Sequence, residues 1–318
     1  MNYNATYAGA SDYRTGRMQD IPDRFGSVRG LTRRGFHRIA YADWGPSVSD
    51  RPIVCVHGLT RNGRDFDPLA GTIAGTGRRV VCPDLPGRGQ SDRLQDGSDY
   101  ALPQYCSDMT VLIAALGAAE IDWVGTSLGG LIGIVLAALP RSPIRRMVIN
   151  DIGPYLPWSG LLRLGSTLAK TPADFETIEA AEEYFRQGLA PFGQLTDVHW
   201  RHLTTHSVRW NSESRRFATL CDPKIAHAFR NPWQYSIDLW KYWDAIDVPL
   251  LVIRGRESDM LPETVLNEMA RRNRNTAVLT VEGCGHAPAL LTSDQIQVVA
   301  EFLNGARGTA PDEGFPPI

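Results

Sequence analysis

The sequence predicts an α/β fold built on a mostly parallel sheet, with a helical segment inserted in its second half. Short apolar runs typical of buried strands alternate with helical segments from about residue 27 onward. The strand pattern stops near Gly153 and returns at Leu250, so the segment between them is expected to be an insertion. With 43% hydrophobic and 21% charged residues among 318, the chain has enough apolar material for one large core.

The first half of the chain is expected to build most of the sheet. Strands are predicted at residues 36–44, 53–57, 79–83, 121–126 and 147–151. Helices are predicted at residues 105–116 and 128–139, and three glycines early in the second helix would allow it to approach the sheet closely. After the insertion, the chain returns with strands at 250–254 and 277–281 and helices at 262–271 and 293–303.

These patterns divide the chain into four parts. Residues 1–26 are polar, show no strand or helix period, and are expected to form a loosely held arm. Residues 27–153 and 247–304 form the sheet domain, and residues 154–246 form a helical cap. The last part, residues 305–318, is rich in Gly, Pro and acidic residues and is expected to be a flexible tail.

Charge and cysteine content narrow the function classes. A net charge of -2 provides no field to attract nucleic acid or an anionic membrane, so a small-molecule substrate is favoured. The five cysteines form an odd set without a CxxC pair, which is typical of reduced thiols in the cytoplasm. The first twenty residues lack the apolar core of a signal peptide, and no run reaches the ~18 apolar residues of a membrane helix.

The strongest chemical motif is Gly125-Thr-Ser127-Leu-Gly129, at the junction of a predicted strand and a predicted helix. In a nucleophile elbow the serine occupies a tight, strained turn, and small residues are needed on either side of it. The alternative is a glycine-rich helix start in which Ser127 is an N-cap. The strand-turn-helix context favours Ser127 as a nucleophile.

Four motifs in order resemble the α/β-hydrolase superfamily over about residues 27–304. They are His57-Gly58, the segment DLPGRGQS at residues 84–91, the elbow around Ser127, and Gly283-Cys-Gly-His286. The resemblance implies an eight-stranded α/β-hydrolase sheet, mostly parallel and flanked by helices, with the cap inserted. Arg88 stands where many relatives have His, a departure without obvious catalytic meaning.

The resemblance also implies an oxyanion hole formed by main-chain amides. Leu59 would supply one N–H from the loop after the strand at 53–57, and Leu128 would supply the other directly after the nucleophile. His57 is expected to support this loop through hydrogen bonds rather than to transfer protons.

The triad of this superfamily runs Ser, acid, His along the chain, and the resemblance places the acid after a late strand. Asp259, in the segment RGRESDML, fits that place, and Glu257 is its near competitor. Asp151 also follows a strand and is kept as the alternative acid, because some members of the fold place their acid there. His286 is the predicted base, in a glycine-containing loop that can carry the imidazole back over the sheet.

The cap is rich in aromatic residues, which suits an apolar or aromatic pocket but is explained equally well by core packing. Arg61, Trp158 and Trp233 are the candidates for contact with the substrate. His199, His202 and His206 have a helical spacing that could imitate a metal-binding face, but no acidic or cysteine partner is recognisable beside them. No metal site is therefore expected there, and the resemblance to α/β-hydrolases implies a reaction without metal or organic cofactor.

These features predict a serine hydrolase that cleaves a carboxylic ester of a small, apolar or aromatic substrate through an acyl-enzyme. A C–C bond hydrolase or an enol-lactonase with the same triad is one alternative. A ligand-binding protein without catalytic purpose on the same scaffold is another. Serine at position 127 disfavours the haloalkane dehalogenase and epoxide hydrolase branches, which resemble this chain but carry Asp at the elbow.

Overall fold

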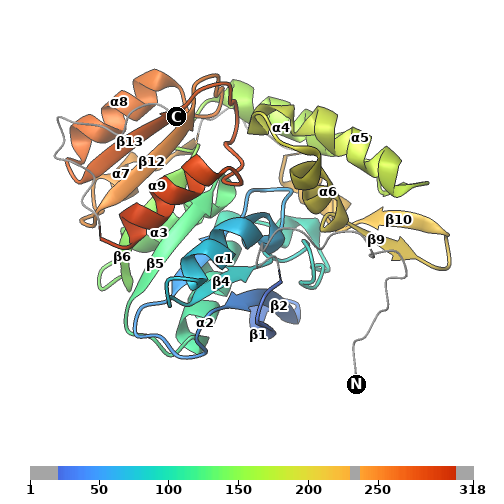
Figure 1. Ribbon diagram of the computed structural model, residues 1–318, viewed down its shortest axis with the longest axis horizontal. Coiled ribbons are helices and arrows are strands. Elements are labelled where there is room, and N and C mark those ends of the chain that lie inside the picture. The colour runs from blue at the N-terminus through green and yellow to red at the C-terminus, as the bar shows by residue number, and fades with distance from the viewer. Residues whose placement is uncertain (1–20, 230–236, 306–318) are drawn as a thin grey trace.

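An eight-stranded sheet organises the protein, whose computed structural model describes residues 21–229 and 237–305 (Figure 1). The strands lie in the order β1-β2-β4-β3-β5-β6-β12-β13. Their bounds are β1 (Arg24–Thr32), β2 (Gly35–Trp44), β3 (Ile53–Val56), β4 (Val80–Pro83), β5 (Ile121–Thr126), β6 (Ile144–Asn150), β12 (Leu250–Gly255) and β13 (Thr276–Val281). Only β2 runs antiparallel to its neighbours β1 and β4, and the other pairs are parallel. The predicted fold class is confirmed.

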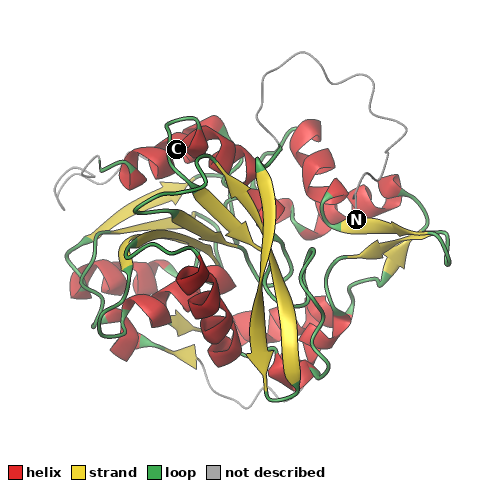
Figure 2. Cartoon of the chain, turned by 90° about the horizontal axis from the view of Figure 1, so that it is seen from below, coloured by secondary structure: helices red, strands yellow, loops and turns green. Residues whose placement is uncertain are grey.

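Helices cover both faces of this sheet (Figure 2). One face packs against α1 (Asp67–Ala74) and α9 (Ser293–Leu303), and the other against α2 (Leu102–Ala115), α3 (Leu128–Ala137) and α8 (Glu263–Arg272). Successive residues of the central strands enter opposite cores: Val54 lies in the α2/α3 core and Cys55 in the α1/α9 core. Because both strand faces are buried, the strands form continuous apolar runs instead of alternating with polar residues.

The segment between β6 and β12 forms the cap, which extends to one side of the sheet domain (Figure 1). Its helices are α4 (Trp158–Ala169), α5 (Ile178–Gly188), α6 (Asp197–Thr205) and α7 (Trp240–Trp243). Its strands are β7 (Tyr155–Leu156), β8 (Asp174–Phe175), β9 (Val208–Asn211), β10 (Arg216–Thr219) and β11 (Ile237–Asp238). Short 3-10 helices occur at Gly63–Phe66, Gly97–Asp99, Ala190–Phe192 and Pro223–Phe229.

Three sequence predictions need correction. The cap was expected to be helical, but β8, β10 and β9 form a small antiparallel sheet in it. Its strands, of two to four residues, are too short to show an apolar period. The sheet domain begins at Arg24, inside the stretch assigned to the arm. It starts with β1, an edge strand in which exposed and half-buried side chains alternate and which includes the exposed Phe25. Helix α1 was not predicted, since it has only eight residues and includes a proline and a glycine.

The rest of the predicted arm and tail, residues 1–20 and 306–318, lies outside the described residues. Within the described ranges, none of the helices combines the length and hydropathy needed to cross a bilayer. All five cysteines are unpaired.

Candidate active site

Ser127 occupies the sharp turn between β5 and α3, with φ 51° and ψ -112°. Both flanking glycines are sterically required there. A Cβ on Gly125 would lie 2.3 Å from the carbonyl oxygen of Gly129, and a Cβ on Gly129 would lie 2.0 Å from the carbonyl oxygen of Val56. The turn therefore has the backbone strain and the crowding that a nucleophile elbow demands.

His286 connects Ser127 to a carboxylate. Its Nε2 lies 2.9 Å from the Ser127 Oγ, and its Nδ1 lies 2.8 Å from the Asp151 Oδ2. Since a carboxylate only accepts, Nδ1 carries the proton in this arrangement and Nε2 is free to accept the serine hydroxyl proton. The three side chains form one continuous chain of hydrogen bonds.

Asp151 is fully buried and held by donors other than the imidazole. The Gly255 amide donates to its Oδ1 at 2.8 Å, and the Ser258 hydroxyl donates to its Oδ2 at 2.6 Å. A buried carboxylate needs such donors to stay ionised away from water. The carboxylate is thereby fixed in position opposite His286.

The prediction that Asp259 partners His286 is wrong. Asp259 lies on the surface with 52% of its side chain exposed, and both of its oxygens bind the Arg163 guanidinium, at 2.5 and 2.8 Å. The loop after β12 turns Ser258 inward toward Asp151, and this places Asp259 outward. Glu257 is exposed as well. The alternative acid, Asp151, occupies the place expected of Asp259.

Neighbouring strands bring the three residues together. Ser127 directly follows β5 and Asp151 directly follows β6, and the Ser127 amide donates to the Asn150 carbonyl at 2.9 Å. The buried Asn150 side chain donates to the Pro288 carbonyl at 2.8 Å, which ties the loop of His286 to the end of β6. Asn150 was missed by sequence reasoning, although an Asn-Asp pair ending an apolar strand was a visible signal.

The loop after β3 approaches the nucleophile closely. A Cβ on Gly58 would lie 3.6 Å from the Ser127 Cβ, so the backbone that leads to Leu59 passes beside the serine. Among the described residues, neither the Leu59 amide nor the Leu128 amide has a hydrogen-bond acceptor. A role of the two amides as oxyanion donors stays a prediction.

His57 supports this loop, as predicted. Its Nε2 accepts the Leu85 N–H at 2.9 Å, so its Nδ1 carries the proton and donates to the Gly58 carbonyl at 2.7 Å. Burial, reinforced by the Arg88 charge, lowers the pKa of His57 to about 3. The ring is thus neutral and occupied on both sides, which rules out proton transfer to a substrate.

Asp84 links the same loop to the segment around Arg88. Its carboxylate accepts from the Gly63 amide at 2.8 Å and from the Gln90 amide at 2.7 Å. Burial raises the pKa of Asp84 to about 6, against the opposing effect of these two amides. These contacts hold the loop after β3 and the loop after β4 together.

The three predicted substrate contacts differ in their surroundings. Arg61 is buried, and its guanidinium binds Asp65 at 2.6 and 2.7 Å and the Ser207 hydroxyl at 2.9 Å. Trp158 is half-buried at the start of α4. Trp233 lies outside the described residues. A role in substrate binding stays a prediction for all three.

The histidines of α6 do have an acidic neighbour, contrary to expectation. Asp67 lies with His202 and His206 so that one ligand atom of each falls within 4.8 Å of the others. However, Arg64 binds the Asp67 carboxylate at 2.5 Å, and burial, together with Arg64, His202 and Arg61, lowers the pKa of His206 to about 2. The carboxylate of this cluster is thus already engaged in an ion pair with Arg64.

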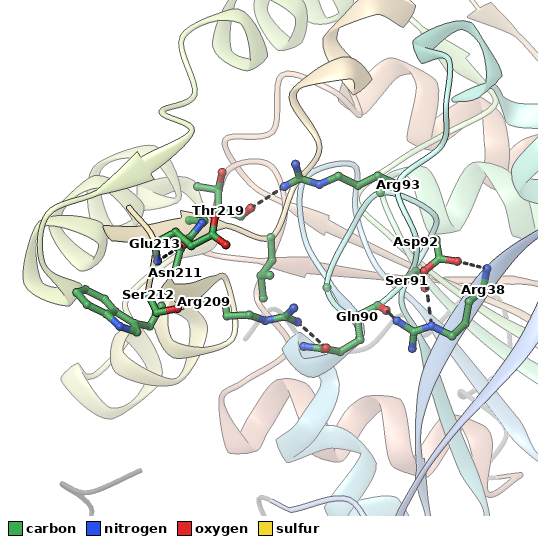
Figure 3. Close-up of a pocket in the computed structure, with 15 residues that line it drawn as sticks. Arg38, Gln90, Ser91, Asp92, Arg93, Arg209, Asn211, Ser212, Glu213 and Thr219 are labelled. Carbon is green, nitrogen blue, oxygen red and sulfur yellow. Dashed lines mark hydrogen bonds and ion pairs between the residues drawn. The ribbon is translucent and has the colours of Figure 1, made fainter. Parts of the chain in front are cut away.

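A cavity of about 590 Å³ lies between the loop after β4 and the β9–β10 hairpin of the cap (Figure 3). Its wall is polar: Arg209 donates to the Gln90 side chain, and Arg93 donates to the Thr219 carbonyl. Ser127, Asp151 and His286 are not among the residues that line it. The cavity is separate from the serine site.

Comparisons with known proteins agree with this fold. The family described as the alpha/beta hydrolase fold matches residues 51–291. A 3-hydroxybutyrate-oligomer hydrolase of Cupriavidus necator is 40% identical over 89% of this chain and 98% of its own length. An esterase of Mycobacterium tuberculosis is 27% identical over 84% of this chain and 85% of its own length.

Among solved structures, an alpha/beta hydrolase from Novosphingobium aromaticivorans is 32% identical and superposes with a TM-score of 0.78, covering 88% of this chain and 98% of its own. The chain therefore belongs to the α/β-hydrolase family and is an enzyme of the hydrolase class.

Proposed function

We propose that this enzyme is a serine hydrolase that cleaves carboxylic esters through an acyl-enzyme, with Ser127, His286 and Asp151 as its triad. The observation that carries the proposal is the continuous hydrogen-bond chain from the Ser127 hydroxyl through both nitrogens of His286 to the buried Asp151 carboxylate. A serine is a weak nucleophile at neutral pH unless such a base is held beside it.

In the acylation step, the Ser127 Oγ attacks the ester carbonyl while His286 Nε2 takes the hydroxyl proton. The carbonyl oxygen becomes negative and accepts from the Leu59 and Leu128 amides. When the C–O bond to the alcohol breaks, His286 returns its proton to the leaving oxygen. Asp151 stabilises the transient imidazolium and holds its tautomer.

In the deacylation step, a water molecule attacks the acyl carbon, and His286 takes one of its protons. The bond between the acyl carbon and the Ser127 Oγ then breaks, and His286 gives the proton back to the serine. The products are the free acid, the alcohol and the original enzyme. Each proton that leaves one oxygen through His286 is returned to another, so the cycle needs no further reactant.

The substrate class that we propose is a short linear ester of a hydroxy acid, such as a 3-hydroxybutyrate oligomer. The support is the relative from Cupriavidus necator, which bears that substrate in its name and aligns over nearly all of its length. Linear esters of this kind are more polar than the apolar or aromatic substrates suggested by the cap composition.

The test is hydrolysis of the 3-hydroxybutyrate dimer and trimer and of p-nitrophenyl butyrate by the wild type and by Ser127→Ala. We expect turnover of the oligomers by the wild type and a loss of about 10⁴-fold or more in kcat for the variant. Equal turnover by both proteins would remove the serine from the mechanism. Preference for an enol-lactone or a vinylogous diketone by orders of magnitude would replace the ester assignment with the lactonase or C–C hydrolase alternative.

A further inference from the structure

Arg88 is a buried cation without an acidic partner. Its side chain is 1% exposed, and no carboxylate oxygen lies within 4.0 Å of its guanidinium in the part of the chain that the structure describes. Its Nη2 has no hydrogen-bond partner there either. The buried Arg79, by contrast, pairs with Asp43 at 3.0 Å.

The guanidinium is held instead by neutral groups. Its Nε donates to the Leu59 carbonyl at 2.7 Å, and its Nη1 donates to the Pro86 carbonyl and to the Tyr105 hydroxyl, both at 2.7 Å. It also lies 5.1 Å from the ring centroid of Tyr105 and 5.6 Å from that of Tyr100. These contacts fix the orientation of the charge but do not neutralise it.

Burying a charge without a counterion destabilises a fold, and a protein with an apolar side chain of similar volume at such a position is often at least as stable. Packing alone therefore does not account for an arginine here. What distinguishes the position is the contact with Leu59, the residue whose amide is the proposed oxyanion donor.

Two consequences follow for the oxyanion loop. Because the Leu59 carbonyl is bound to Arg88, and His57 binds the carbonyl of Gly58, both peptides around the Leu59 α-carbon are restrained. The uncompensated positive charge also reaches the site, since Arg88 contributes to the lowered pKa of His57 at the start of the same loop. A positive field at this point favours a negative oxygen more than a neutral carbonyl.

We propose that Arg88 is a positioning residue of the oxyanion hole: it fixes the Leu59 peptide and supplies a positive field that stabilises the tetrahedral oxyanion. It acts through Leu59 and does not touch the substrate. The inference rests on the proposed serine mechanism. The inference also gives a role to Arg88, which stands where many relatives have a histidine.

The test compares Arg88→Met, which removes the charge, with Arg88→Lys, which keeps it, on p-nitrophenyl butyrate. We expect kcat to fall about 10- to 100-fold in Arg88→Met and less in Arg88→Lys, with KM within about twofold of the wild type. A trifluoromethyl ketone, whose adduct with Ser127 carries an oxyanion, should lose affinity in parallel with kcat. The affinity for butyramide, an uncharged ligand that forms no stable adduct, should stay the same.

Arg79→Met is the matched control, because it removes a buried arginine at the opposite end of β4. It is expected to lower the free energy of unfolding while the folded enzyme keeps the wild-type kcat. If Arg88→Met does not fold, kcat and the affinity for the ketone are compared between Arg88→Lys and Arg88→Gln instead. Arg88→Gln, which removes the charge, should then lose more of both.

The inference would be overturned if the charge-removing variants kept the wild-type kcat and the wild-type affinity for the ketone. It would also be overturned if these variants lost affinity for the ketone and for butyramide equally. The proposed function fails independently, if Ser127→Ala keeps its activity.

Discussion

Two loops at the same edge of the sheet each carry an aspartate, but the two carboxylates differ in burial and in their bonding partners. Asp151, after β6, is fully buried and receives hydrogen bonds from His286, Gly255 and Ser258. Asp259, after β12, is half-exposed and binds the exposed Arg163 of the cap. The comparison teaches that a triad acid is defined by the donors around it, because only a fixed, desolvated carboxylate can orient an imidazole.

The two loops also cooperate. The loop after β12 supplies no acid to His286, but through Gly255 and Ser258 it supplies two of the donors that hold Asp151. The place at which the superfamily resemblance put the acid thus contributes to the site as a support.

The largest effect is expected for Asp151→Asn. The amide should invert the tautomer preference of His286 and lose the stabilisation of the imidazolium, so kcat should fall about 10⁴-fold. Ester turnover measured with an excess of substrate tests this. A loss below about tenfold would show that the hydrogen bond between His286 and Asp151 is not functional.

The contrast between buried and exposed groups also predicts how stability depends on pH. His57 and His206 are neutral in the fold, with pKa values lowered by burial to about 3 and about 2, but they protonate near 6.5 when unfolded. Their stabilisation is complete above pH 6.5 and is lost as the pH falls below it, by about 2 kcal/mol for each histidine at pH 5.

The free energy of unfolding in urea should therefore fall between pH 7.5 and pH 5 in both proteins. The fall should be about 2 kcal/mol smaller in His206→Gln than in the wild type. The same pH difference in the free energy of unfolding of both proteins would contradict a half-buried His206 that is neutral in the folded protein.

A smaller effect is expected for Ser258→Ala, which removes one donor from Asp151 and leaves the other. We expect kcat to fall about tenfold with KM unchanged, because the carboxylate loses part of its orientation. Ser214→Ala, in the exposed turn between β9 and β10, is the control and should behave as the wild type. A larger change in KM than in kcat would point to a disturbed pocket instead.

The smallest effect is expected for Asp259→Asn. Its ion pair with Arg163 is exposed, and such pairs contribute about 1 kcal/mol or less to stability. We expect kcat within twofold of the wild type and a loss of stability that shrinks in high salt. A hundredfold fall in kcat would reinstate Asp259 as a catalytic group.

Local sequence was sufficient to predict most of the sheet and to single out Ser127 and His286, whose side chains lie within hydrogen-bond distance of each other. The central strands could be recognised as continuous apolar runs because both of their faces are buried. The glycines around Ser127 could be recognised because contacts within a few residues and with the adjacent strand require them. His286 could be recognised because its loop follows the last strand.

The acid could not be chosen in the same way. Asp151 and Asp259 both follow strands, and the choice between them depends on where Gly255, Ser258 and His286 lie relative to β6. Those contacts join residues more than 100 positions apart, which no local pattern encodes. The short cap strands were missed for a different reason: β9 and β10 form a local hairpin, but their few residues show no apolar period.

The most direct test of the triad is labelling with a fluorophosphonate, followed by peptide mapping and by measurement of the second-order rate constant. The account predicts a single adduct on Ser127, formed about 10³-fold more slowly in Asp151→Asn and at the wild-type rate, within twofold, in Asp259→Asn. An adduct on another residue, or a rate that depends on Asp259 and not on Asp151, would contradict it.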